Sequence, residues 1–569
     1  MLRNALRSPV SPVALGLGVL LGLSPASCSS SEGGGGFSGA ANAGAPGPGA
    51  GSSAVAGGGG GGATSGGGAA PGGPTSGGTS GGMSSGGASG NGEVPGGAAG
   101  STAGGGSATA GSGGSGGTAG GGSAVPGGGD AFVSGVNIDV HPEVKTVLVV
   151  TWTQTKASES TWLEFTFEDG NVMTSRPSPG TAGAHKDVVL GVPGSTNVTV
   201  RIVNKASGVD HKTRDYQDMT GAVPKGMPVP TILAYDAAKA SPDRWLFGSV
   251  ENSDGGCASQ SCYYHTTFWV YIMDRKGRVV WYFAEPSGNS TPSFQRIARD
   301  GEYIWIEKRP FGGNSTRAVR KMTLDWEYVE EIPVPQLSDC IDVTDDGGLL
   351  YDVGGTNPQL REMNAAGTVR NIWSCRTQFG QNFRCYSNTV NWNPADNTIL
   401  MSFPEERTVI QINRATGAVV GLYGAASGSY AFSPSTWGFG YQHFPTITPE
   451  GTLLVSSHMP GYENTRMPVA GQHAFMEFTI DRTNRRLIEK WVYNAGPEWA
   501  MFKGMALRLP NGNTLANYGT GGVIREITPS KETVFHVKFD VPTGNDFFNK
   551  MVGHNVLIDD LYALNGGPN

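Results

Sequence analysis

Apolar and polar residues alternate along much of the chain from residue 131 onward. The segments KTVLVVTWTQT, STWLEFTFEDG, HKDVVLGV and STNVTVRIVN carry this pattern, and Gly, Pro, Ser or Asn residues separate them. Because side chains on a strand alternate between its two faces, such segments predict β-strands that bury one face. Residues 131–225 are therefore predicted to form a small antiparallel β-sandwich.

In the spacing of its strands, this segment resembles fibronectin type III domains, which are β-sandwiches. The stretch GAVPKGMPVPTI at 221–232 follows it and contains three prolines. Since proline stiffens a linker, this stretch predicts a short connection into a second domain, which we place at 226–569.

A two-part phrase recurs from about residue 231. Its first part is an apolar strand after an Asp, Gly or Asn turn, and its second part is a strand pair around another tight turn, as in IMDRKGRVVWYF and EMNAAGTVRNIW. We expect Gly or Asn in both kinds of turn because these residues tolerate positive φ. The turn residues of the first part are 46 to 61 residues apart: Gly301, Gly347, Asn397, Gly451 and Gly512.

Repeats of this length, with about four strands each, predict a β-propeller of about six blades. One or two β-sandwiches with irregular hairpins are the alternative. No segment shows helical periodicity. The predicted fold class is therefore all-β, with an N-terminal fibronectin-like β-sandwich followed by a six-bladed β-propeller.

The first 28 residues follow the pattern of a signal peptide. Arg3 and Arg7 carry positive charge, an apolar run follows at 13–23, and small residues precede Cys28. The run is too short to span a bilayer, which takes roughly 20 apolar residues. The residues before Cys28 resemble the lipobox of bacterial lipoproteins, apart from a proline and a serine. This resemblance implies acylation of Cys28, and ordinary cleavage nearby is the alternative.

Residues 29–130 consist almost entirely of Gly, Ser, Ala, Thr and Pro. Such a segment buries too little apolar surface to offset the loss of backbone entropy, so we expect a disordered tether. The sequence thus predicts an exported lipoprotein of the cell envelope, lipid-anchored on the periplasmic or outer surface. The tether would hold the folded domains away from the membrane.

The charge of the chain narrows the classes of partner. Its net charge is −7 and it has no runs of Lys and Arg. This composition argues against a nucleic-acid partner and against a polybasic membrane patch. We therefore expect a small molecule or another protein as the partner, and the sequence leaves the oligomeric state open.

Six cysteines in an exported chain are candidates for disulfides. Cys257 and Cys262 bracket one short loop, and Cys375 and Cys385 bracket a longer one. Both pairs could close locally, which would leave Cys340 without a cysteine partner among the folded domains. Other pairings remain open.

Common motifs of nucleotide, metal and hydrolase sites are absent from the folded part of the sequence, and we predict no metal and no cofactor. One long approach to a predicted inner strand differs from the others, because it is rich in aromatic residues and glycine: GSYAFSPSTWGFGYQHFPTITPEGTLLVSS. His443 lies in it, eight residues before Gly451. Since propeller ligands usually bind where such approaches converge on the axial channel, His443 is a candidate site residue; a structural histidine is the alternative.

The pattern around His443, together with GMALRLPNGNTLANYGTGGVIREITP and YSNTVNWNPADNTILMSFPEERTVIQINRATGAVVGLYG, resembles the bacterial arylsulfate sulfotransferases over roughly residues 231–540. This resemblance implies an exported six-bladed propeller that moves a sulfuryl group from one phenol to another without a nucleotide donor. It also implies that the substrate is a small phenolic or aryl sulfate molecule. His443 matches the family's histidine nucleophile, which becomes transiently sulfated.

The sequence departs from the family at the groups that assist this histidine. Where the family has a histidine before an Asn-Ser-Ile phrase, this chain has Tyr386 before Asn388, and a packing role is expected for the tyrosine. The family's arginine has no exact match, although Arg407 lies a few residues on, and another family histidine is replaced by Asp339 or Cys340.

The candidate catalytic set is therefore His443, Tyr386, Asn388 and Arg407. Loss of one oxyanion donor typically costs about 3 to 4 kcal/mol. A catalytically degenerate propeller that binds a small aromatic, glycan or protein partner is therefore the alternative to an enzyme.

Overall fold

The computed structural model describes residues 131–566 apart from several gaps. The gaps are at 169, 253–266, 286–294, 298–301, 309–316, 356–357, 435–437, 459–472, 495–497, 499, 501–502 and 540–550. The predicted signal peptide, the predicted tether and Cys28 therefore lie outside the described residues, as do Cys257 and Cys262.

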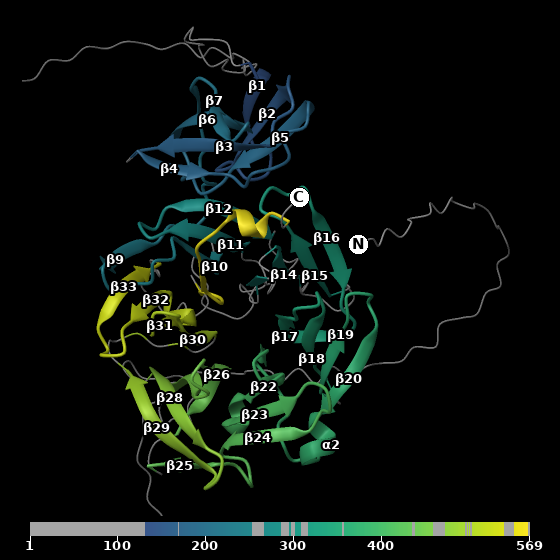
Figure 1. Ribbon diagram of the computed structural model, residues 1–569. Coiled ribbons are helices and arrows are strands. Elements are labelled where there is room, and N and C mark those ends of the chain that lie inside the picture. Colours follow the sequence, from purple (N-terminus) through teal and green to yellow (C-terminus); the bar gives the residue numbers. More distant parts are fainter. Residues whose placement is uncertain are drawn as a thin grey trace, which may run out of the picture. The chain divides into compact units, whose positions relative to one another are not determined.

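Two antiparallel sheets form the N-terminal β-sandwich (Figure 1). The period-two pattern seen in the sequence appears as alternating burial along β3, because one face of each strand packs into the core. The first sheet has the order β1(Val133–Val140)-β2(Leu148–Gln154)-β5(Gly183–Val189). The second has the order β4(Asn171–Thr174)-β3(Ser160–Phe167)-β6(Asn197–Ala206)-β7(Val209–Lys212), with β8(Tyr216–Met219) also paired to β6.

Six further sheets form the blades of a β-propeller, numbered here 1 to 6 (Figure 1). Blades 1 to 3 are β34(Val556–Ile558)-β10(Trp245–Asn252)-β11(Thr267–Asp274)-β12(Val279–Glu285), β13(Gln295–Ile297)-β14(Ile304–Lys308)-β15(Ala318–Met322)-β16(Val329–Pro333) and β17(Leu337–Val343)-β18(Leu349–Val353)-β19(Gln359–Met363)-β20(Val369–Ser374). Blade 4 is β21(Val390–Asn393)-β22(Thr398–Phe403)-β23(Thr408–Asn413)-β24(Val419–Gly424). Blade 5 is β26(Gly440–Ile447)-β27(Leu453–His458)-β28(His473–Asp481)-β29(Arg486–Tyr493)-β25(Ala431–Ser433), and blade 6 is β30(Gly504–Arg508)-β31(Thr514–Tyr518)-β32(Val523–Ile527)-β33(Thr533–Lys538)-β9(Thr231–Tyr235). The all-β prediction of a sandwich followed by a six-bladed propeller is confirmed.

Both ends of the propeller segment take part in closing the ring. β9, which enters the domain, pairs with β33 at the outer edge of blade 6. β34, near the end of the described chain, pairs with β10 at the inner edge of blade 1. β34 thus supplies the fourth strand of blade 1, whereas β9 adds a fifth strand to blade 6.

The turn chemistry expected from the sequence is found at most of the described turns. In the first part of the repeat, the turn residues Gly347, Asn397, Gly451 and Gly512 have positive φ. In two hairpins, however, the residue with positive φ is neither Gly nor Asn but Arg485 or Lys531. The expectation was therefore wrong at these two turns, where the exposed charged residue itself takes the left-handed conformation.

One short helix departs from the expectation of no helix. α2(Cys375–Phe379) follows blade 3, and the side chain of Ser374 caps it by accepting a hydrogen bond from Thr377 N. Gly380 ends it with φ of 74°. A single turn fixed by its caps leaves no periodic pattern in the sequence, so periodicity could not have predicted it.

The sandwich and the propeller belong to one compact unit and share a hydrophobic core. Tyr562, beyond the last propeller strand, donates its hydroxyl proton to Val188 O at 2.9 Å and accepts a hydrogen bond from Leu190 N at 3.1 Å. The segment after β34 therefore contacts the sandwich, and β34 itself completes blade 1 of the propeller.

Candidate functional site

His443 lies on β26, the first strand of blade 5, rather than in a loop ahead of the inner strand as the sequence suggested. The pairing of β26 with β27 shifts register on both sides of His443. Tyr441 and Phe444 have positive φ, at 46° and 47°. Bulky residues rarely adopt this conformation, which costs of order 1–3 kcal/mol each. The histidine is thus presented by a doubly bulged, strained strand.

Gln442 holds this irregular strand in place. Its side chain is completely buried. Its Nε2 donates to Ser402 Oγ at 3.2 Å, Phe403 O at 3.1 Å and Thr408 O at 3.0 Å. These acceptors all belong to blade 4, so the glutamine fastens β26 to the neighbouring blade and offsets the strain.

Asn388 lies in the segment just before β21, and its side chain contacts His443. Its Nδ2 lies 3.0 Å from His443 Nδ1 and donates to Gln442 O, also at 3.0 Å. A carbonyl oxygen can only accept, so the contact with Gln442 sets which way the Asn388 amide points. The amide therefore donates to Nδ1 as well, which leaves the proton of a neutral His443 ring on Nε2.

A second histidine, His473 on β28, is connected to the first through β27, which lies between the two strands. Ser456 is the cross-strand partner of His443, and its Oγ is 3.0 Å from His473 Nε2. Ser456 and His473 are both buried. A Cβ placed on Gly504 of β30 would overlap Ser456 Oγ. This close approach explains the glycine, and the sequence contained no signal that would have placed His473 here.

His554, in the segment just before β34, contacts the residue that follows His443. The ring of His554 packs against Phe444, with ring centroids 4.2 Å apart in a T-shaped arrangement. His554 is buried. The residue that follows His443 therefore contacts the segment that closes the ring, a contact that the sequence could not indicate because it spans more than a hundred residues.

Tyr386 is not the packing residue that the sequence suggested, because 57% of it is exposed. Its neighbours Cys385 and Ser387 are buried, so burial alternates along this stretch and the Tyr386 side chain faces outward. Cys340, which stands near the place of a family histidine, is buried in a core cluster shared by blades 2, 3 and 4. Its backbone N–H donates to Asp352 Oδ1 at 2.7 Å.

Arg407 ends the short helix η1(Pro404–Glu406), which contacts β26. Its φ of 47° lies in the left-handed region. Its backbone N–H donates to Pro404 O at 3.1 Å, and its carbonyl accepts from Ala425 N at 3.0 Å. Of the four candidate residues, the structure thus joins His443 and Asn388 directly and places Arg407 on an element beside them.

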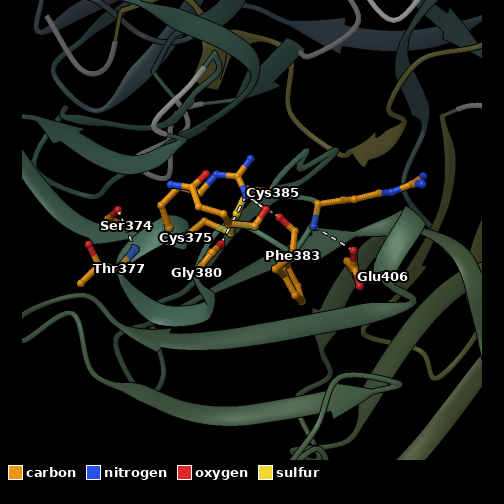
Figure 2. The surroundings of a disulfide bond; sticks show 10 residues. Ser374, Cys375, Thr377, Gly380, Phe383, Cys385 and Glu406 are labelled. Carbon is orange, nitrogen blue, oxygen red and sulfur yellow. Dashed lines mark hydrogen bonds between the residues drawn. A yellow bond between two sulfur atoms is a disulfide. The ribbon is translucent and has the colours of Figure 1, made fainter.

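A disulfide joins Cys375 and Cys385, with Cα atoms 5.9 Å apart (Figure 2). It closes the loop between α2 and the approach to β21 just before Tyr386 and Asn388. Within the described residues, no group of three or more His, Cys, Asp or Glu side chains is arranged to hold a metal ion. None of the described helices is long and apolar enough to cross a membrane.

Comparisons with known proteins give only distant structural likenesses. No family model and no curated protein matches the sequence. A Bacteroides caccae protein of unknown function is similar with a TM-score of 0.37 and 15% identity, over 56% of this chain and 100% of that one. TolB from Acinetobacter baumannii is similar with a TM-score of 0.37 and 10% identity, over 64% and 80%. Virginiamycin B lyase from Staphylococcus aureus has a TM-score of 0.28 and 13% identity, over 44% and 70%.

Proposed function

We propose that this chain is an arylsulfate-sulfotransferase-like enzyme that moves a sulfuryl group from an aryl sulfate to a phenol by way of His443. The observation that carries the proposal is the doubly bulged strand that presents His443, with positive φ at Tyr441 and Phe444 on the two sides of the histidine. Backbone strain of this kind gathers at functional sites. The sequence resemblance independently singles out the same histidine.

The reaction would proceed in two displacements at sulfur. First, the lone pair of His443 Nε2 attacks sulfur, an N–S bond forms, and the S–O bond to the donor phenol breaks. The phenolate oxygen leaves with the electron pair and takes a proton from water. Second, the acceptor phenol attacks sulfur and gives its proton to water, while the N–S bond breaks and returns the lone pair to Nε2. Such a relay replaces one difficult step with two easier ones.

This chemistry needs the proton on Nδ1, which is the opposite of the tautomer that the Asn388 amide favours. Turning the amide over would present Oδ1 to Nδ1–H and give up the hydrogen bond to Gln442 O. That carbonyl would keep its hydrogen bond from Ser402 Oγ at 3.0 Å. The cost is one neutral hydrogen bond, roughly 0.5–1.5 kcal/mol, plus the repulsion between Oδ1 and Gln442 O, which would face each other as two acceptors. This total is smaller than the barriers that enzymes lower.

The test is to incubate the purified chain with a chromogenic aryl sulfate and a phenol acceptor. We expect phenol release by the wild type, with transient addition of one sulfuryl group to the protein by intact mass. His443→Ala should lower the rate by at least about 10³-fold, because the nucleophile is gone. The matched control is His211→Ala, an exposed histidine of the sandwich, which should leave the rate unchanged. Equal rates for wild type and His443→Ala would refute the proposal.

A second candidate, binding without transfer, is favoured by one observation. As the Asn388 amide lies, the Nε2–H of His443 is a hydrogen-bond donor suited to a sulfate or phenolic oxygen, not a nucleophile. This candidate predicts that the wild type binds the aryl sulfate but releases no phenol and gains no mass. His443→Ala should then weaken binding, with no reaction to lose.

A further inference from the structure

A hollow of about 290 Å³ lies between blade 3 and the loop that the Cys375–Cys385 disulfide closes. Among the described residues, its lining includes neither His443 nor Asn388. Ligand pockets usually measure about 300–1,000 Å³. This hollow is therefore the size for a molecule with a single ring, and it is separate from the site proposed above.

A buried carboxylate lines the hollow. Asp352, on β18, is only 3% exposed. Its Oδ1 accepts from Cys340 N at 2.7 Å, and its Oδ2 accepts from Ser387 Oγ at 2.9 Å. A carboxylate can accept about four hydrogen bonds. Asp352 can therefore hold the approach to β21 and also accept a hydrogen bond from the hydroxyl group of a ligand.

Arg376 supplies positive charge from the disulfide loop. Its Nη1 donates to Gly380 O at 3.3 Å, Gln381 O at 2.8 Å and Phe383 O at 2.7 Å, so the backbone of the loop surrounds the guanidinium. Within the described part of the chain its Nε is buried and makes no hydrogen bond. Since its partners are carbonyl oxygens, they leave its full charge in place, and an anionic ligand would neutralise it.

Two exposed side chains also line the hollow, Arg384 in the disulfide loop and Tyr386 just after it. Arg384 pairs with Glu405 at 2.9 Å, and its side chain is 68% exposed. Tyr386 is 57% exposed and offers an aromatic face to a ring. A buried acceptor, two guanidinium groups and an exposed aromatic ring thus converge on one small volume.

We propose that this hollow is a binding site for a single ring that carries both a hydroxyl and an anionic group. Asp352 accepts the hydrogen bond of the hydroxyl, Arg376 and Arg384 bind the anionic group, and Tyr386 packs against the ring. Both a hydroxyaryl acid and an acidic sugar have this chemistry.

The experiment measures binding to the full chain by ligand-observed NMR and calorimetry. The charged probes are 4-hydroxybenzoate and glucuronate, and their neutral counterparts are phenol and glucose. We expect one charged probe to bind at least about tenfold more tightly than its neutral counterpart, since hydrogen bonds to charged groups are the stronger ones. The probe that binds identifies the ring as aryl or sugar.

Two substitutions and two controls test whether the charged probe binds in this hollow. Arg384→Gln should weaken binding of the charged probe at least about threefold and leave the neutral probe unchanged, whereas Tyr386→Ala should weaken both. Both residues are exposed, so unfolding midpoints should match the wild type. Arg201→Gln, which removes a salt-bridged arginine from the sandwich, should have no effect. The proposal is overturned if charged and neutral probes bind equally, if neither substitution matters, or if His443→Ala abolishes binding.

Discussion

Asn388 determines which nitrogen of His443 carries the proton. The amide reaches both His443 Nδ1 and Gln442 O, and the carbonyl settles its orientation. A side chain that touches no substrate can thus decide whether the histidine donates a hydrogen bond or offers a lone pair. The difference between a binding site and a nucleophile then rests on a single rotation of one amide.

Replacing this amide by a carboxylate should reverse the tautomer. Asp at position 388 can only accept, so Asn388→Asp should move the proton of His443 to Nδ1. The nitrogen-15 shifts of the imidazole report the tautomer directly, with Nε2–H expected in the wild type and Nδ1–H in the variant. Asn388→Ala, which neither donates nor accepts, is the control. The same tautomer in the wild type and in Asn388→Asp would contradict the assignment.

Packing at Gly504 gives a second prediction at this scale. A Cβ there would overlap Ser456 Oγ, which already contacts His473. Gly504→Ala should therefore lower the free energy of unfolding by about 1–3 kcal/mol, the usual cost of overpacking. Gly226→Ala is the control, because the nearest atom to its Cβ would be 3.9 Å away. Urea unfolding measures both, and an unchanged midpoint for Gly504→Ala would disprove the close approach.

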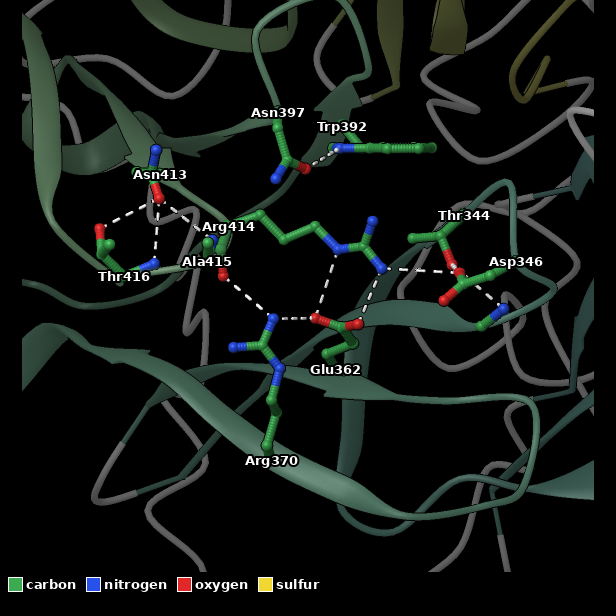
Figure 3. Close-up of polar contacts among 11 residues, drawn as sticks. Thr344, Asp346, Glu362, Arg370, Trp392, Asn397, Asn413, Arg414, Ala415 and Thr416 are labelled. Carbon is green, nitrogen blue, oxygen red and sulfur yellow. Dashed lines mark hydrogen bonds and ion pairs between the residues drawn. The ribbon is translucent and has the colours of Figure 1, made fainter.

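Blades 3 and 4 are joined by a cluster of charges at the level of their hairpins (Figure 3). Glu362, on β19, accepts from Arg414 Nη2 at 2.8 Å and also pairs with Arg370. Arg414 lies over the ring of Trp392, 5.0 Å from its centroid. The glutamate and Arg414 are only 10% and 15% exposed. Glu362 therefore pairs with two guanidinium groups where the blades meet, and Asp346 lies 3.6 Å from Arg414 Nη2.

Glu362→Gln should destabilise the propeller, because Arg370 loses its counter-charge and Arg414 keeps only Asp346, 3.6 Å away. We expect a loss of roughly 2–3 kcal/mol, somewhat less than for a fully buried pair. The matched control is Glu331→Gln, on the exposed strand β16. Its carboxylate pairs with Lys308, and its loss should change stability by less than about 1 kcal/mol. Urea unfolding of both variants provides the comparison, and equal small losses would show that the cluster does not join the blades.

The sequence predicts regular elements well and bulged ones poorly. Gly347 and Gly451 mark turns because positive φ there is a local requirement, visible in the residue type. β26 escaped prediction because Tyr441 and Phe444 take positive φ on either side of the Gln442–His443 pair, where the Gln442 side chain is bonded to blade 4, and no local pattern encodes this arrangement. Asn388 and His443 are 55 residues apart, so their contact could be found only in the folded chain.

The sandwich contains one carboxylate whose titration should affect the whole molecule. Asp187, on β5, accepts a hydrogen bond from Ser175 Oγ and one from Val188 N at 2.8 Å. Burial raises the pKa of Asp187 to about 6, although these hydrogen bonds oppose the rise. It lies close to Tyr562, through which the end of the chain anchors the sandwich.

Because its folded pKa is above its unfolded value, Asp187 binds a proton more tightly in the folded state. Its charged form therefore costs stability above pH 6, and this cost disappears as the pH falls from about 6 toward 4. We expect Asp187→Asn to be more stable than the wild type at pH 7 by roughly 1–3 kcal/mol and to lose most of this advantage near pH 4. Urea midpoints at several pH values test this, and a pH-independent difference would argue against the raised pKa.

The pairing of β34 with β10 has a consequence for the order in which the protein can fold. Blade 1 lacks its inner strand until residues 556–558 have left the ribosome, more than three hundred residues after β10. Contacts across such a separation form slowly. Until then the edge of β10 offers unpaired backbone groups to any passing strand. Nascent or truncated chains should thus be the species most prone to aggregate. Pairing of residues 556–558 with β10 removes this risk, because it covers the open edge of blade 1.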